Sequence, residues 1–248
     1  MRIFAANANN KDLTHCVSSA AVLLRVPFAT LGPFELLALD CSYLIKYTGS
    51  VIEIRQTETY SKWFDNLRDR RARVRIDLRI RRLSLGNPGD VKPIGGGVSE
   101  LRVDYGPGYR VYFVQRGPAL IILLAGGDKR TQQRDIRKAL NWHGCYEVAM
   151  NKIAKIKTRP WDAAEHLKSD ADMAAYLEAA LEDGDPALIA AALGDIARAK
   201  GMSEIARETG LGRESLYKAL SPEGNPEFAT VLKVVRALGL RLHATADA

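Results

Sequence analysis

The stretch from residue 95 to residue 137 constrains the fold most, because its hydrophobic rhythm, its turns and its charges agree. Val98, Leu101 and Val103 mark a first strand, and a Gly-Pro-Gly sequence then turns the chain. Apolar and polar residues alternate through a second strand, and the apolar run at 120–124 is typical of a central strand covered on both faces. The stretch therefore predicts a three-strand meander that leads into a helix.

Residues 51–93 precede this meander with a short strand and two helices. The strand begins at Val51, and helical spacing of apolar residues then predicts one helix from Thr57 and a second from about Arg71. The element order over residues 51–143 is β-α-α-β-β-β-α. The fold class is therefore α+β, with a small, mainly antiparallel sheet in the first half of the chain.

Four arginines form a stripe along the second of these helices: Arg71, Arg75, Arg79 and Arg82. They lie one position around from the apolar stripe of the same helix. Such a stripe can hold phosphates. The sequence favours the alternative, a polar face paired with Asp69, with Asp77 and with acidic residues of the second half.

The charge of the chain is divided between its halves. Residues 51–143 hold 19 Lys and Arg against 10 Asp and Glu, whereas residues 144–248 hold 13 against 16. A basic module joined to a mildly acidic one indicates that the first binds a polyanion and that the two attract each other. Ordinary solubility charge explains the acidic half equally well.

Three distant cysteines, Cys16, Cys41 and Cys145, support neither a disulfide framework nor a zinc site, and a reducing cytoplasm fits them best. No apolar run is long enough for a membrane span, and we expect no membrane association, metal or cofactor. Residues 1–50 show no sustained period and form a poorly patterned N-terminal extension, and residues 144–157 resemble a linker.

The second half, residues 158–248, is predicted to be entirely helical. Ser169 and Asp185 are expected to cap two helices, and Asn225-Pro226 to cap the last one. Between them, two short helices are separated by residues 209–212, a pattern typical of a helix-turn-helix. Ala206 allows the helices to cross closely, and Gly210 suits the left-handed turn.

The exposed start of the second short helix predicts an interface with DNA. Its side chains can reach phosphates and base edges in a major groove: Arg213, Glu214, Ser215, Tyr217 and Lys218. A helical hairpin used only for packing is the simpler alternative. One such unit buries little surface on DNA, so we expect a symmetric homodimer on an operator.

Cationic side chains carry the candidate chemistry of the first half, because residues 51–143 contain no Cys and only one His, His143. Those on or beside the sheet are Lys92, Arg102, Arg110, Lys129 and Arg130. Such a cluster can bind a phosphate, stabilise a phosphoryl-transfer transition state and assist attack by a ribose 2′-hydroxyl. Simple binding without catalysis is the commoner role of a basic sheet.

Several stretches of residues 51–142 resemble toxins of the RelE/ParE superfamily, in particular the Hig-type addiction module killer branch. The resemblance rests on IRRLSLGNPGDVKPIGGGVSELRVDYGPGYRVYF and LLAGGDKRTQQRDI. The stretch that begins KIKTRPWDAAEHLKSDADMAAYLEAAL resembles the HigA-type antidote with its helix-turn-helix. The chain thus looks like a toxin fused in frame to its antitoxin, in the gene order typical of Hig-type operons.

The resemblance implies ribosome-dependent cleavage of messenger RNA by the first half, neutralisation by the second and repression of the shared operon. Lys92, Arg102, Arg110 and Arg130 match basic positions of the toxin family. Several members carry a Tyr or His near the start of the last helix, where this chain has Gln133 to Ile136. Lys129 and Gln132 are the nearest candidates for that role.

Three functions remain open from the sequence. The first is a messenger RNA endoribonuclease held inactive by its own DNA-binding inhibitor, through contacts within one chain or between chains. The second is a transcriptional regulator whose toxin domain has no activity. The third is a ParE-like inhibitor of DNA gyrase, which binds rather than cleaves.

Overall fold

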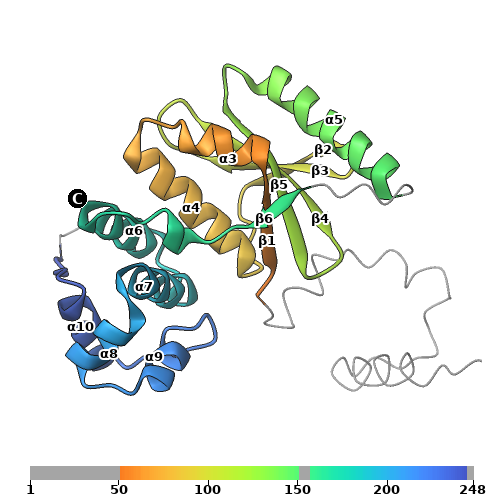
Figure 1. Cartoon of the computed structure of the whole chain (residues 1–248). Coiled ribbons are helices and arrows are strands. Elements are labelled where there is room, and N and C mark those ends of the chain that lie inside the picture. Colours follow the sequence, from red (N-terminus) through yellow and green to blue (C-terminus); the bar gives the residue numbers. More distant parts are fainter. Residues whose placement is uncertain (1–50, 151–156, 245–248) are drawn as a thin grey trace, which may run out of the picture. The chain divides into compact units, whose positions relative to one another are not determined.

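The structure is a computed structural model that describes residues 51–150 and 157–244 (Figure 1). The poorly patterned extension predicted for residues 1–50 lies outside the described residues. The described part contains a six-strand sheet and eight α-helices, so the predicted α+β class is confirmed.

The sheet has the strand order β2-β3-β4-β5-β1-β6 and is mainly antiparallel, as predicted. Only β1 and β5 run parallel to each other among the described strand pairs. The strands are β1 (Glu53–Thr57), β2 (Val91–Gly95), β3 (Val98–Val103), β4 (Tyr109–Arg116), β5 (Leu120–Asp128) and β6 (Thr158–Pro160). The predicted meander corresponds to β3, β4 and β5.

Strand β2 corrects the predicted order, because the sheet of the first half contains one strand more than the sequence pattern indicated. Its sequence, VKPIG, does not alternate regularly and contains Pro93. A proline is tolerated there because β2 lies at the edge of the sheet. The pairing with β3, rather than local hydrophobic periodicity, thus creates this strand.

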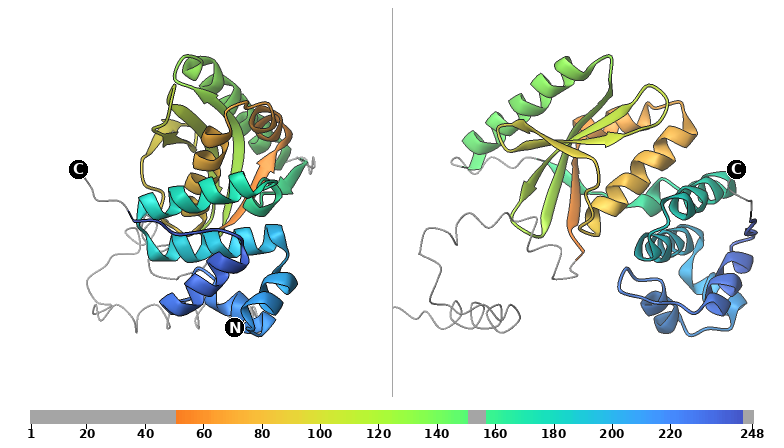
Figure 2. Two further views of the ribbon diagram at one scale, coloured as in Figure 1. Left: turned by 90° about the vertical axis from the view of Figure 1, so that its left-hand side faces the viewer. Right: turned by 180° about the vertical axis from the view of Figure 1, so that it is seen from behind.

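Helices cover both faces of the sheet (Figures 1 and 2). Helices α3 (Glu58–Asp65) and α4 (Arg70–Ser84) contribute Tyr60, Phe64 and Ile76 to a large core on one face. Helix α5 (Gln132–Met150) covers the other face, where Ala139 packs against a separate, smaller core. Helix α5 therefore extends into the segment from Gly144 that the sequence predicted to be a linker.

The second half begins with β6 and continues through helices. These are a short 3-10 helix η3 (Ala163–Glu165), α6 (Asp170–Asp183), α7 (Pro186–Lys200), α8 (Met202–Thr209), α9 (Arg213–Ala219) and α10 (Phe228–Ala237). The prediction of an entirely helical second half is corrected by β6, which has three residues and is too short to show a period.

The predicted caps hold for two helices and fail for one. Ser169 forms a capping box with Asp172 at the start of α6, and Asp185 caps α7, in which Pro186 is the first residue. Helix α10 begins at Phe228 with Glu227 at the capping position and no side-chain cap, so Asn225-Pro226 is not its cap. Ser169 and Asp185 both come directly before helices rich in apolar residues. Their side chains bind backbone N–H groups of the first turn, which have no partner within the helix.

One core runs through both halves of the chain. The large core on the α4 face of the sheet includes Ile54 and Ile80 from the first half and Leu193, Ile205 and Val235 from the second. Helix α4 lies between the sheet and helices α6 and α7, as Figure 1 shows. The two halves thus share apolar surface, which stabilises their association at roughly 25 cal/mol per Å² of apolar area buried.

Candidate functional site

A buried carboxylate joins two of the predicted catalytic arginines. The Glu100 side chain is fully buried, and its Oε1 atom accepts a hydrogen bond of 2.9 Å from Nε of Arg102. Its Oε2 atom lies 3.4 Å from Nε of Arg110 and accepts a 2.9 Å hydrogen bond from Nε2 of Gln132. We call these four residues the Glu100 cluster; they lie on β3, β4 and the first turn of α5.

Strand pairing explains why these side chains meet. Arg102 and Arg110 are direct partners across β3 and β4, and Glu100 is the partner of Tyr112. Alternation places them on the face of the sheet that α5 covers. Burial, reinforced by the negative charge of Glu100, raises the pKa of Tyr112 far above its usual range, so its phenol stays protonated.

The remaining predicted cations lie around this cluster without joining it. Lys92 is exposed on β2, opposite Glu100 in the strand register. Lys129 and Arg110 both lie near Gly108, where an added Cβ would be 3.8 Å from Cβ of Lys129 and 3.7 Å from the Arg110 guanidinium. Arg130 is exposed and pairs with Asp128 at 2.9 Å.

Sequence reasoning missed Glu100 and Tyr112. The available signal was the alternation itself, because Glu100 occupies the same face of its strand as Arg102. A carboxylate there balances one of the two guanidinium charges and fixes where both groups point. Gln132, which the sequence offered as a candidate for the missing catalytic partner, is the residue that connects α5 to the cluster.

Two short helices lie where the helix-turn-helix was predicted. Helix α8 ends at Thr209, the following Gly210 is left-handed with φ of 69°, and α9 begins at Arg213. All five predicted DNA-binding side chains of α9 are exposed, and the Arg213 guanidinium lies 5.6 Å from the ring centre of Tyr217. On the opposite side of α9, Leu216 is buried in the core.

Close packing against α7 holds this pair of helices in place. A Cβ on Gly194 would lie 2.6 Å from the carbonyl oxygen of Leu220, the residue that ends α9. Only glycine permits this approach. Ala206 is also buried, as expected for a small residue where α8 crosses its neighbour.

Ion pairs connect the arginine-rich helix α4 with α6. Arg75 lies 2.8 Å from Glu182 and Arg82 lies 2.6 Å from Asp183. A third pair joins Arg70 to Asp172 at 3.0 Å. Two of the four stripe arginines, Arg75 and Arg82, are therefore paired with the acidic second half, as the favoured prediction stated. Arg79 donates instead to the Pro88 carbonyl, and Asp69 caps α4.

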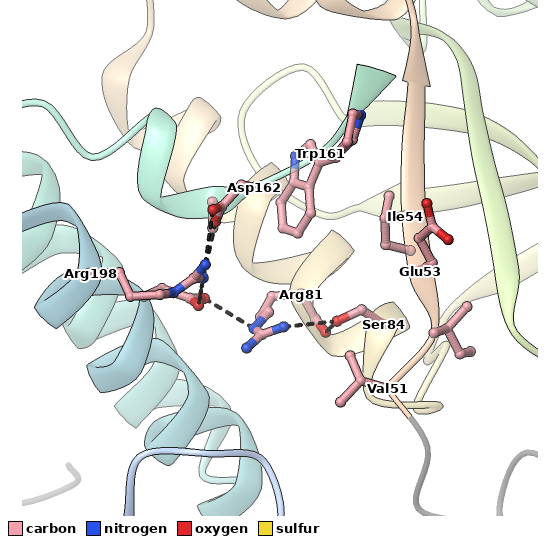
Figure 3. Close-up of a pocket in the computed structure, with 12 residues that line it drawn as sticks. Val51, Glu53, Ile54, Arg81, Ser84, Trp161, Asp162 and Arg198 are labelled. Atoms are coloured by element: carbon pink, nitrogen blue, oxygen red, sulfur yellow. Dashed lines mark hydrogen bonds and ion pairs between the residues drawn. The ribbon is translucent and has the colours of Figure 1, made fainter. Parts of the chain in front are cut away.

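A second polar network joins α4 to α7 (Figure 3). Asp195 is almost fully buried and contacts Arg81 at 3.0 Å and Arg198 at 2.6 Å. Arg198 also contacts Asp162 at 2.9 Å, and these residues line a cavity of about 290 Å³ that Val51 and Trp161 complete. Burial raises the pKa of Asp195, while the two arginines oppose this by favouring its ionised form.

Asp77 forms a buried pair with His166 rather than with an arginine. The Nδ1 atom of His166 lies 3.0 Å from Oδ2 of Asp77, and the imidazole packs 4.6 Å from the ring of Phe64. Burial opposes protonation of His166, but the charge of Asp77 and its hydrogen bond outweigh burial, so the pKa of His166 is raised.

Strand β6 adds to the sheet beside β1. Thr57 pairs with Thr158 and Arg55 with Pro160 in an antiparallel register, and the N–H group of Trp161 donates to the Ile54 carbonyl at 2.9 Å. The second half therefore completes the sheet of the first by strand addition.

In the described part of the chain, no group of three or more His, Cys, Asp or Glu side chains is arranged to hold a metal ion. None of the described helices combines the length and the apolar character needed to cross a membrane.

Comparison with known proteins assigns the second half. Residues 157–246 match the family described as "Probable addiction module antidote protein". Two proteins of Haemophilus influenzae, both described as uncharacterized, are 48% identical over 88 residues and 54% identical over 83 residues. These matches cover 36% and 34% of this chain, and 89% and 86% of the two relatives.

The chain belongs to the addiction module antidote family. Its antidote domain, residues 157–246, includes β6, helices α8 and α9, and the described residues of the second half that form ion pairs with α4. The chain thus takes part in a toxin–antitoxin system, and an antidote implies a toxin as its partner. No solved structure matches the chain significantly.

Proposed function

We propose that the chain is a toxin and its antidote fused in one polypeptide. Residues 51–143 are the toxin, an endoribonuclease of the RelE/ParE type that cleaves messenger RNA on the ribosome. The antidote domain holds this toxin inactive, binds operator DNA as a homodimer and represses its own operon. Both activities belong in the cytoplasm.

The contacts between the two halves carry this proposal. A domain of an antidote family adds a strand to β1 and places acidic side chains on α4 of the domain that precedes it. These are contacts that an antidote makes with its toxin: main-chain hydrogen bonds, complementary charge and a shared apolar core. We therefore propose that the toxin partner implied by the antidote family is the first half of the same chain.

The Glu100 cluster supports the nuclease. Arg102 and Arg110 hold their guanidinium groups on one face of the sheet, and Lys129, like Arg110, lies near Gly108. A phosphate bound there would receive charge-assisted hydrogen bonds as negative charge develops during attack by the 2′-hydroxyl. We assign Glu100 the role of a positioning residue that orients both arginines.

The location of the antidote contacts supports inhibition by obstruction. Most described contacts of α6 and α7 with the first half fall on α4, whereas Glu100 lies on the other face of the sheet, beneath α5. Arg102 alone of the predicted catalytic residues lines a cavity of about 400 Å³ together with Glu182 and Asp183. The antidote thus blocks a large partner such as a ribosome more effectively than a small ligand.

Production of residues 51–150 without the antidote domain tests the proposal. Growth arrest with cut messenger RNA is the expected result, and the substitutions Arg102→Ala and Arg110→Ala should each relieve it while the fragment keeps its circular dichroism spectrum. Toxicity that neither substitution changes would contradict the assigned site.

The same experiment separates the alternatives. Arrest with DNA breaks that depend on gyrase would favour a ParE-like inhibitor. A folded fragment with no effect on growth, in a chain that still binds its own promoter, would favour a transcriptional regulator with an inactive toxin domain.

A further inference from the structure

A crevice opens where the two parallel strands of the sheet end. Strands β1 and β5 are neighbours, and each is followed by a helix: α3 after β1 and α5 after β5. These helices pack on opposite faces of the sheet. In sheets with parallel strands, such a point leaves a crevice outside the carboxyl ends, where ligands commonly bind.

Two glycines shape this crevice. A Cβ on Gly126 would collide with the indole ring of Trp63 from α3, and a Cβ on Gly127 would collide with the carboxylate of Asp135 from α5. Each glycine thus admits a side chain from a different face of the sheet. The resulting cavity has a volume of about 350 Å³, and its described lining residues all come from positions 59–138.

The walls of the crevice differ in character. On one side lie the partly exposed Trp63, Leu67 and Tyr109, and on the other Arg134 and Lys138, whose side chains are 64% and 52% exposed. The neighbouring carboxylates already have partners. Asp128 accepts hydrogen bonds from the backbone of the turn that starts α5, and Asp135 accepts them from the Thr131 hydroxyl and, at 3.3 Å, from Nζ of Lys138. Nε of Arg134 lies 3.7 Å from the same Asp135 carboxylate, and both cations remain more than half exposed.

Aromatic surface facing flexible cations is a combination that recognises a nucleotide. A base stacks on rings such as Trp and Tyr, while Arg and Lys hold its phosphate. The crevice also adjoins the Glu100 cluster, because Gly127 is the register partner of Arg110 and Asp128 that of Tyr109. A single strand of RNA bound along the sheet would therefore pass from the crevice to the Glu100 cluster.

We propose that this crevice binds one nucleotide of a single-stranded RNA, with its base against Trp63 and Tyr109 and its phosphate on Arg134 and Lys138. The choice of RNA rests on the proposed function. Of the predicted catalytic arginines, Arg130 lines the crevice, whereas Arg102 and Arg110 do not. Its occupation by a mononucleotide can be measured without cleavage.

Calorimetric titration of the full-length chain with adenosine 5′-monophosphate tests this site. Binding is expected, with weaker binding of both ribose 5-phosphate and adenosine. The double substitution Arg134→Glu, Lys138→Glu should lower the affinity for the nucleotide by about tenfold or more, because two charge-assisted contacts are lost. The exposed residues Lys168 and Arg236 provide a matched control, since the double substitution Lys168→Glu, Arg236→Glu should leave the affinity unchanged.

Three results would overturn the inference. The first is that the wild-type chain does not bind adenosine 5′-monophosphate. The second is that the Arg134→Glu, Lys138→Glu variant binds it as tightly as the wild type does. The third is that ribose 5-phosphate binds as tightly as the nucleotide, which would mark a simple anion site. Cleavage of messenger RNA by residues 51–150 together with any of these results would leave the proposed function intact. If the full-length chain binds the nucleotide specifically but residues 51–150 cleave no messenger RNA, the nucleotide site stands and the proposed nuclease function fails.

Discussion

Arg81 of α4 lies 3.0 Å from the carboxylate of Asp195 in α7, and this carboxylate is 1% exposed. Asp195 also binds Arg198 and accepts a 3.1 Å hydrogen bond from the Tyr176 hydroxyl. Removal of a buried carboxylate leaves its cationic partners uncompensated. We therefore expect Asp195→Ala to lower the free energy of unfolding by about 3 to 5 kcal/mol in urea denaturation.

Glu208→Ala is the control for this prediction, because Glu208 is exposed on α8. Its effect should stay within about 0.5 kcal/mol, as is usual for surface positions. An Asp195→Ala variant as stable as the wild type would show that the network does not hold the halves together.

The His166–Asp77 pair predicts a dependence of stability on pH. The pKa of His166 in the folded chain is raised above its usual value of 6.5. Its contribution to the unfolding free energy is therefore complete below pH 6.5 and is lost as the pH rises through the folded pKa. The urea midpoint should fall as the pH rises above 6.5, and His166→Gln should make this fall smaller. The same fall in both proteins would exclude the pair as its source.

The close contact of Gly194 with Leu220 predicts that one added methyl group at Gly194 lowers stability and disturbs the packing of α8 and α9. Gly194→Ala forces α7 away from the carbonyl of Leu220, and overpacking of this kind costs about 1 to 3 kcal/mol. We expect a lower melting temperature and weaker operator binding. Gly184→Ala is unsuitable as a control because Gly184 is left-handed, but Ala187→Gly in α7 leaves the contact intact and should preserve DNA binding.

Arg213 predicts the salt dependence of DNA binding. If Arg213 contacts a phosphate, Arg213→Ala should weaken binding of operator and unrelated DNA alike and lower the slope of log K against log salt by about one. If it reads a base, the loss should be confined to the operator. Unchanged affinity for both DNAs in a gel-shift titration would remove α9 from the interface.

The sequence predicted elements with their own periodicity and missed those that depend on a neighbour. Helix α4 and strands β3 to β5 were predicted because their apolar spacing is regular. Strands β2 and β6 have little pattern, and they exist because β3 and β1 offer unpaired backbone groups at their edges. The stretch from Gly144 to Met150 was predicted to be a linker because it lacks apolar periodicity, but it continues α5.

The candidate site was predictable in part. Alternation correctly places Arg102 and Arg110 on one face, but only the strand register shows that they meet at Glu100. The crevice beside Trp63 was not predictable at all. It depends on β1 and β5 being adjacent, although 67 residues separate Thr57 from its hydrogen-bond partner Leu124 in the sequence.

The place of β6 in the sheet sets an order of events during synthesis. Residues 51–143 leave the ribosome first, with the β1 edge open until β6 and the helices behind it follow. At about 5 to 20 residues per second, roughly a hundred further residues need some 5 to 20 seconds. A fused toxin would thus fold beside a translating ribosome before the antidote domain has been synthesised. The rate of translation would then determine how long the toxin domain stays uninhibited.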